Sequence, residues 1–269
     1  MLRRGDMLTS SGDDMSILDQ WINPYYLEDE TVESIKEAII AKPVVKYAVL
    51  DNFFREEMLE KLIKHHGLLN FSEEADRRSP ENGAWLPYDG AVVFAKKGLH
   101  FGSDLFYDDE WHRYLGYLSS TDLKYPCHSE IKLRYHRPEA DGFWIHTDSV
   151  LRSMVAILYF NKEWKASDGG LLQLWRVDET LSPNAHVVET PTGRMDCLTQ
   201  HARIRTSTPG GGFPDKKPHD LVLIDQIVPA YNRLFICNFK HSMAYHSVTP
   251  SNGKPRLGFV QWLMDQKGG

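Results

Sequence analysis

The sequence predicts a mainly β fold with flanking helices: a double-stranded β-helix core of the jelly-roll or cupin-like kind, with N-terminal helices packed on one sheet. Two observations support this prediction. Eight short runs rich in β-branched and aromatic residues follow one another from about residue 128 to 264, and turn residues separate them. The segment ahead of them has helical periodicity instead. Eight strands in succession are typical of a barrel or jelly roll.

Three amphipathic helices are expected ahead of the β-rich part. The first covers residues 28–41, has acidic residues in its first turn, and ends before Pro43. The second covers 55–67 and stops at Gly67, and a strand is expected before it over 46–54. The third covers 108–120. The residues expected to face inward are Val32, Ile35, Ala38 and Ile39 in the first helix and Trp111, Tyr114, Leu115 and Leu118 in the third.

The eight strand candidates define the boundaries of the core. They are the runs 131–138, 143–149, 153–161, 169–177, 220–229, 232–240, 243–248 and 256–264. Residues 1–16 are polar and are expected to form a flexible tail, which leaves 17–269 as a single domain. Residues 178–220 are polar and rich in Gly and Pro, so we expect a long irregular insertion there, a candidate lid.

Composition and charge limit the function classes. The 269 residues are 42% apolar and 25% charged, as in an ordinary globular protein. The net charge of −6 gives no electrostatic argument for nucleic acid or an anionic membrane. No secretory signal or membrane span is expected. Three cysteines without a CxxC pair argue against a disulfide framework or zinc finger and favour a reducing, cytoplasmic location. Nothing in the sequence sets the oligomeric state.

The most informative pattern is the pair His146 and Asp148, followed about a hundred residues later by His246. In a strand, side chains at i and i+2 point to the same face, roughly 6.6 Å apart. Alone, such a pair is more often two polar residues on a surface strand. Here the pair ends one strand and His246 begins another, so we expect one ion to be shared. Two histidines and one carboxylate with open opposite positions are the ligands of non-haem Fe(II) oxygenases.

Arg256 lies ten residues beyond His246, inside an apolar run. A buried guanidinium needs an anionic partner, and its planar fork matches a carboxylate. The alternative is an arginine on the solvent face of an edge strand. With the metal ligands nearby, we favour a role in binding the distal carboxylate of a dicarboxylic cosubstrate.

The motifs HTDS, LRSMVAILYFNKEW, DGGLLQLW, IVPAYNRLFICNF and YHSVTPSNGKPRLGFVQW together resemble the Fe(II)/2-oxoglutarate-dependent dioxygenases, in particular the prolyl-4-hydroxylase-like branch. The resemblance covers roughly residues 128–264. It implies that His146, Asp148 and His246 bind iron and that Arg256 binds the C5 carboxylate of 2-oxoglutarate. It also implies that Tyr159 hydrogen-bonds that carboxylate. Tyr135 is expected to line the same pocket, with a core aromatic as the alternative. Gly169 and Gly170 match a pair of glycines that form a backbone turn.

The resemblance implies an oxygenase that hydroxylates an unactivated C–H bond and releases succinate and CO₂. Its cofactors would be Fe(II), 2-oxoglutarate and O₂, with ascorbate as a reductant. Asp148 favours hydroxylation, because halogenating relatives replace this carboxylate by a small residue. The substrate stays open between an amino acid, a peptidyl (prolyl-type) residue and a small natural product. Val155, where some protein-prolyl hydroxylases have threonine, and the insertion at 178–220 add to this uncertainty.

Two other function classes remain. One is a non-enzymatic barrel or sensor that binds metal or 2-oxoglutarate. The other is a hydrolytic or isomerising cupin-type metalloenzyme, which would have no need for Arg256. For the remaining polar residues, we expect Arg152 either to be solvated or to reach an acidic group of a substrate. Trp144 and Trp262 are expected to pack in the barrel. Asn161 and Asn238 are expected either to stabilise turns or to donate hydrogen bonds near the metal. His136 lies outside the motif.

Overall fold

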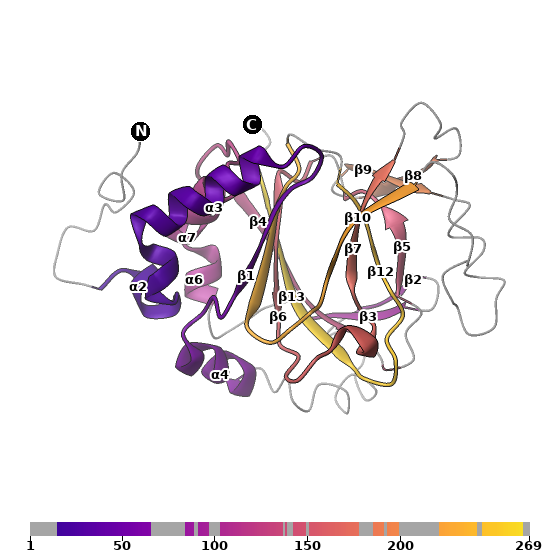
Figure 1. Ribbon diagram of the computed structural model, residues 1–269, viewed down its shortest axis with the longest axis horizontal. Coiled ribbons are helices and arrows are strands. Elements are labelled where there is room, and N and C mark those ends of the chain that lie inside the picture. The colour runs from indigo at the N-terminus through magenta and orange to yellow at the C-terminus, as the bar shows by residue number, and fades with distance from the viewer. Residues whose placement is uncertain are drawn as a thin grey trace.

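Two antiparallel sheets face each other, with helices outside one of them (Figure 1). The computed structural model describes residues 15–65, 84–88, 91–96, 103–136, 138, 142–148, 151–177, 185–190, 193–198, 221–240 and 244–265. The expected tail, apart from residues 15 and 16, lies outside these ranges, as do Gly67 and the side chain of Trp144.

The larger sheet has seven strands in the order β1-β11-β6-β13-β4-β3-β2. Their bounds are β1 Lys46–Asp51, β2 Ala84–Tyr88, β3 Ala91–Lys96, β4 His128–His136, β6 Met154–Tyr159, β11 Arg233–Asn238 and β13 Arg256–Met264. The smaller sheet has six strands in the order β10-β7-β12-β5-β9-β8. Their bounds are β5 Phe143–His146, β7 Leu172–Val177, β8 Ala185–Thr190, β9 Gly193–Leu198, β10 Leu221–Ile227 and β12 Tyr245–Val248.

The eight predicted strands form the core of both sheets. β4, β6, β11 and β13 belong to the larger sheet, and β5, β7, β10 and β12 to the smaller one. The chain therefore crosses between the sheets at almost every connection, as in a double-stranded β-helix. Every neighbouring pair is antiparallel. The predicted fold class is confirmed.

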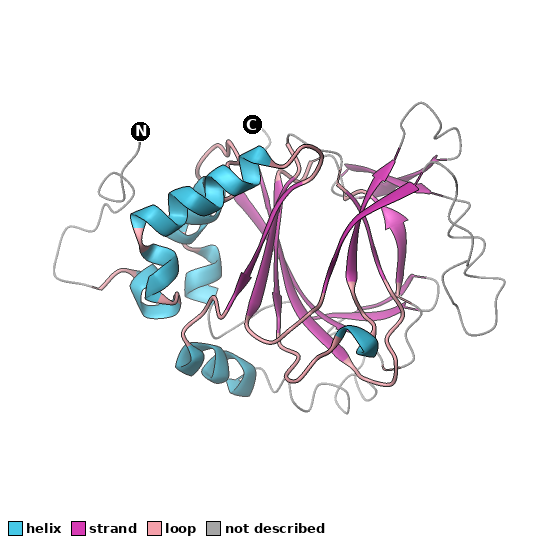
Figure 2. Ribbon diagram, viewed as in Figure 1, coloured by secondary structure: helices cyan, strands magenta, loops and turns pink. Residues whose placement is uncertain are grey.

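The helices lie against the outer face of the larger sheet (Figure 2). They are α2 Ile17–Trp21, η1 Pro24–Leu27, α3 Asp29–Ala41, α4 Glu56–His65, α6 Ser103–Tyr107 and α7 Asp109–Leu118, and a further short turn, η4 Ala166–Asp168, precedes β7. The predicted inward face of α7 is buried, as are Val32 and Ile39 of α3. Ala38 was predicted to face inward but is exposed, because the neighbouring elements cover Val32 and Ile39 but not this edge of the helical face.

Alternation along the central strands separates the two cores. On β6, Met154 and Leu158 pack on the helix side, while Val155 and Tyr159 pack inside the barrel. Both faces of this strand are covered, which explains why its sequence is a continuous apolar run. The barrel interior, not the helix layer, therefore contains the polar residues of the predicted site.

The prediction of an irregular loop over residues 178–220 is partly wrong. Two strands from this segment, β8 and β9, pair with each other and extend the smaller sheet beyond β5. His146 of β5 is opposite Cys197 of β9. The remainder of 178–220 lies outside the described residues. Strands β2 and β3, which were not predicted, lengthen the larger sheet. Among the described helices, none is long and apolar enough to cross a membrane.

Candidate metal and cosubstrate site

The three predicted metal ligands lie together where β5 ends and β12 begins, in the middle of the smaller sheet. His146 and His246 are opposite each other across β5 and β12, with ring centroids 4.3 Å apart. Asp148 follows β5 by two residues. One donor atom from each of His146, Asp148 and His246 lies within 4.8 Å of the others. Imidazole and carboxylate are suitable donors for Fe(II), so the cluster fits one divalent ion.

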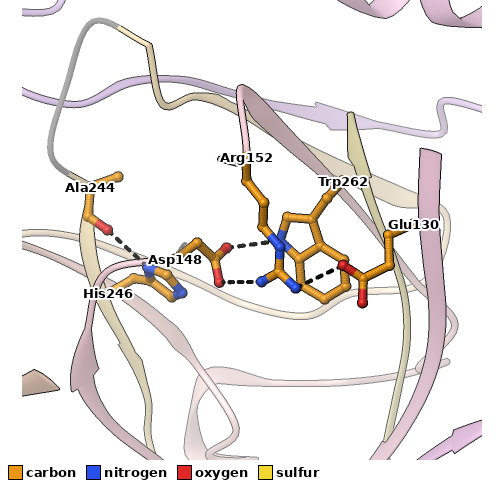
Figure 3. Close-up of polar contacts among 6 residues, drawn as sticks. All are labelled: Glu130, Asp148, Arg152, Ala244, His246 and Trp262. Carbon is orange, nitrogen blue, oxygen red and sulfur yellow. Dashed lines mark hydrogen bonds and ion pairs between the residues drawn. The ribbon is translucent and has the colours of Figure 1, made fainter. Parts of the chain in front are cut away.

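A backbone contact orients the His246 ring. Its Nδ1 lies 2.9 Å from the carbonyl oxygen of Ala244 (Figure 3). A carbonyl oxygen can only accept, so the hydrogen is on Nδ1 and the Nε2 lone pair is available for a metal. Metal-binding histidines usually have such a partner, because it fixes both the tautomer and the ring plane.

Asp148 is hydrogen-bonded through both carboxylate oxygens. Trp262 Nε1 donates to Oδ2 at 2.8 Å, and Arg152 NH1 donates to Oδ1 at 3.0 Å (Figure 3). Burial acts to raise the pKa of Asp148, but Arg152, the two imidazoles and the Trp262 N–H hold it well below its usual value. Asp148 is therefore a carboxylate throughout the physiological pH range.

Two expectations for this region need correction. A solvated Arg152 is wrong, because its side chain is only 10% exposed and forms ion pairs with Asp148 and Glu130. A pure packing role for Trp262 is also wrong, since its N–H contacts the Asp148 carboxylate. Asn161 and Asn238 bind backbone groups: Asn161 donates to the carbonyl oxygens of Pro229 and of Leu257 in β13, and Asn238 to those of Ser119 and Ser120 after α7.

Arg256 is buried inside the barrel on a central strand, so the solvent-face alternative is wrong. Its NH1 lies 3.1 Å from His136 Nε2, and its NH2 is 3.5 Å from the Tyr159 hydroxyl. Within the described part of the chain, Nε has no hydrogen-bond partner and no carboxylate pairs with the guanidinium. A buried cation without an anion is costly unless a ligand supplies one.

The neighbours of Arg256 leave it able to bind an anion. Burial, together with Arg256 and Arg134, holds the pKa of His136 well below its usual value, so the ring is neutral and accepts from Arg256. Burial raises the pKa of Tyr159, which remains a phenol that can donate. Gly170 has φ +63°, and a Cβ there would lie 2.8 Å from Arg256 Cδ. The glycine turn thus leaves room for the arginine stem.

The register of β13 against β4 brings in residues that sequence reasoning missed. His136 is opposite Arg256, Arg134 is opposite Gly258, and Glu130 is opposite Trp262. One signal was present in the sequence: polar residues at every second position of β4, a pattern usually assigned to a solvent face. Tyr135 is opposite Leu257 on the backbone, and its side chain lies outside the described part. Its role at the site stays a prediction.

One pocket contains both halves of the site. His146, Asp148, His246 and Arg256 all line it, and it encloses about 630 Å³, counting the solvent at its mouth. Much of the remaining wall is apolar and includes Val155, Ile157, Leu172, Leu174, Phe235 and Val260. This combination of an apolar wall with a few convergent polar groups is typical of a small-molecule site.

Residues 133–200 match the family model described as the 2OG-Fe(II) oxygenase superfamily. The chain resembles the 2OG-Fe(II) oxygenases in sequence and in fold. The match begins within β4 and includes two of the three metal-site residues, His146 and Asp148. The resemblance noted from the sequence motifs is confirmed by this match. No curated protein matches the sequence.

Solved structures share the fold at low sequence identity. A prolyl 4-hydroxylase from Phytophthora capsici is 18% identical with a TM-score of 0.51; the match covers 90% of this chain but only 63% of that one. A prolyl-4-hydroxylase from Pseudomonas putida is 14% identical with a TM-score of 0.50, covering 88% of this chain and all of that one (100%). HygX from Streptomyces hygroscopicus, solved with nickel and 2-oxoglutarate, is 11% identical with a TM-score of 0.50, covering 83% and 84%.

Proposed function

We propose that this protein is an Fe(II)- and 2-oxoglutarate-dependent oxygenase that hydroxylates an unactivated C–H bond. The observation that carries the proposal is that one pocket joins a His-Asp-His cluster to a buried arginine that has no carboxylate partner among the described residues. A dicarboxylate that chelates a metal at one end and meets a guanidinium at the other satisfies both features. Neither a purely structural metal site nor a hydrolytic one requires Arg256.

The chain's residues have separate roles in this proposal. His146, Asp148 and His246 hold the metal, and the Ala244 carbonyl keeps His246 in the correct tautomer. Arg256, supported by neutral His136, binds the C5 carboxylate together with Tyr159. When bound, Fe(II) and 2-oxoglutarate supply O₂ activation, with succinate and CO₂ as co-products and ascorbate as a reductant. The apolar wall of the pocket limits the access of water.

The substrate class is proposed only broadly. An amino acid, a peptidyl residue of the prolyl type and a small natural product all fit an oxygenase with this site. Amino-acid and peptidyl substrates are the first to test, because two prolyl 4-hydroxylases share the fold at 18% and 14% identity. Tyr135 is proposed to line the cosubstrate pocket with Arg256 and Tyr159. The segment 178–220 is proposed to act as a lid over the substrate.

The proposal is tested by 2-oxoglutarate turnover with panels of free amino acids, prolyl peptides and small natural products. Succinate formation is followed together with mass spectrometry for a product heavier by one oxygen atom. We expect a substrate-stimulated rate that requires both Fe(II) and O₂. Tight metal and 2-oxoglutarate binding with no turnover on any panel would favour a non-enzymatic barrel. Product formation that is independent of O₂ would favour a cupin-type hydrolase or isomerase.

A further inference from the structure

The Asp148 carboxylate accepts hydrogen bonds from Arg152 and Trp262 on the side opposite His246. Figure 3 shows Arg152 and Trp262 on one side of the carboxylate and the His246 ring on the other. The two donors engage different oxygens, at 3.0 Å from Arg152 and 2.8 Å from Trp262. A carboxylate held by one donor can still rotate about its Cβ–Cγ bond. Two donors from different elements fix its plane.

Arg152 is itself held in three ways. Its NH1 donates to Asp148, its NH2 donates to Glu130 at 2.9 Å, and its guanidinium carbon lies 3.8 Å over the Trp262 ring. Glu130 and Trp262 are opposite each other across β4 and β13. The contacts therefore form a closed ring that joins β4, β13 and the segment between β5 and β6. The guanidinium plane matches this geometry, which an ammonium group could not satisfy in the same way.

Arg152 and Glu130 have opposite electrostatic effects on a metal ion bound by Asp148. A guanidinium 3.0 Å from a metal ligand repels a divalent cation, which alone would weaken metal binding. Glu130, 2.9 Å from the same guanidinium, offsets that charge. The side chains of Arg152 and Glu130 are only 10% and 21% exposed, so solvent screens neither fully. The site thus has the rigid, planar donor geometry of the Arg152 guanidinium, while Glu130 offsets much of the positive charge of that group.

We propose that Arg152 is a positioning residue of the metal centre: with Trp262 it fixes the plane of the Asp148 carboxylate, and Glu130 both seats Arg152 and offsets its charge. This inference rests on the proposed function, because it takes Asp148 as a metal ligand. It adds two residues, Arg152 and Glu130, that lie outside the pocket lining and do not touch the cosubstrate subsite at Arg256.

The decisive variant is the double substitution Arg152→Gln/Glu130→Gln, which removes one positive and one negative charge. The net charge around Asp148 is unchanged, so any loss of metal affinity is a loss of position. The measurement is calorimetric titration of Mn(II) into metal-free protein, with circular dichroism to verify folding. We expect Mn(II) to bind about 10- to 100-fold more weakly than to the wild type. The absorption spectrum of the Co(II)-loaded protein, which reports coordination geometry, is expected to change as well.

Single substitutions separate position from charge. Glu130→Gln leaves the Arg152 charge uncompensated, so it should weaken Mn(II) binding. Trp262→Phe keeps an aromatic ring beneath Arg152 but removes the indole N–H, and should give a smaller loss of Mn(II) affinity. Arg152→Lys keeps the charge without the fork, and its affinity should lie between those of the wild type and the double variant. The matched control is Lys162→Gln/Glu60→Gln, which removes an exposed ion pair outside the pocket lining and should leave Mn(II) affinity unchanged.

The outcomes distinguish this inference from the function on which it rests. A wild-type protein that does not bind Mn(II) would contradict the proposed function and the inference with it. Wild-type binding together with a folded double variant whose affinity stays within about twofold, or becomes tighter, would overturn the positioning role alone.

Discussion

At the scale of single residues, Arg256 is the group whose surroundings most clearly require a ligand. Hydrogen bonds to a charged group contribute roughly 1.5–3 kcal/mol. We therefore expect Arg256→Gln to raise the Kd of 2-oxoglutarate about 10- to 150-fold. The measurement is calorimetric titration of 2-oxoglutarate into Mn(II)-loaded protein. Arg233→Gln is the matched control, because Arg233 pairs with Asp51 rather than with a pocket group. A change of less than about twofold in the Kd of 2-oxoglutarate in Arg256→Gln would contradict the proposed role of Arg256 in cosubstrate binding.

His136 gives the protein a pH dependence with a definite sign. Its pKa is held below the ordinary 6.5, so below that pH the unfolded chain takes up a proton that the folded site does not. The free energy of unfolding should therefore fall as pH drops below 6.5, by up to about 1.4 kcal/mol per pH unit from this group.

Urea unfolding at neutral and mildly acidic pH tests this dependence. In His136→Gln, where the amide oxygen can still accept from Arg256, we expect a smaller acid-induced loss of stability than in the wild type. His128→Gln on the same strand is the control, since His128 is exposed. Identical pH dependence in His136→Gln and the wild type would show that this ring titrates freely in the folded protein.

The residues that could be predicted from the sequence are those with fixed chain spacing. His146, Asp148, His246 and Arg256 stand in motifs whose intervals are visible in one dimension. The partners of these residues are not visible in this way, because they depend on which strands are neighbours and in what register. Glu130 and His136 reach the site only through the pairing of β4 with β13.

At the scale of elements, the turn before β7 contains Gly169 and Gly170, which pack closely against Pro250 and Arg256. Gly169 has φ +71° and ψ −154°, a region open essentially to glycine alone, and an added Cβ would lie 2.0 Å from the Pro250 carbonyl oxygen. We expect Gly169→Ala to lower the free energy of unfolding by more than the 1–3 kcal/mol or so of backbone strain. Chemical denaturation measures this quantity.

Gly253→Ala is the matched comparison for that turn. Gly253 has φ +80°, but an added Cβ would meet nothing within 4 Å, so this variant has the strain without the clash. It should be destabilised less than Gly169→Ala. Equal losses of stability in the two variants would show that the close approach to Pro250 contributes nothing.

The strands of the core were predictable because each is an apolar run bounded by turn residues. The hairpin of β8 and β9 was missed because its strands are short and mixed in polarity, and lie in a segment rich in Gly and Pro. Its attachment depends on a tertiary contact, the pairing of β9 with β5, which local sequence does not encode. The expectation for Ala38 failed for a related reason: helical spacing gives a face, but not how far the neighbouring sheet covers it.

At the scale of the whole molecule, stability and chemistry occupy different layers. The helix-side core is built from aromatic and aliphatic residues such as Phe53, Trp111 and Phe259. The barrel interior holds the cations, the neutral His136 and the His-Asp-His cluster. β6 and β13 belong to both layers, one face to each. This division explains how a rigid scaffold can hold a costly set of buried charges in one pocket.

The central claim is that Asp148, with the two histidines, holds the iron that activates O₂. The most direct measurement is Fe(II)-dependent formation of succinate from 2-oxoglutarate by the wild type and by Asp148→Ala, with circular dichroism to verify that both are folded. We expect turnover in the wild type and a loss of at least about 100-fold in the variant, because removing only a hydrogen-bond partner of a metal ligand already lowers activity about 10- to 100-fold. Succinate formation at the wild-type rate in a folded Asp148→Ala protein would contradict the account.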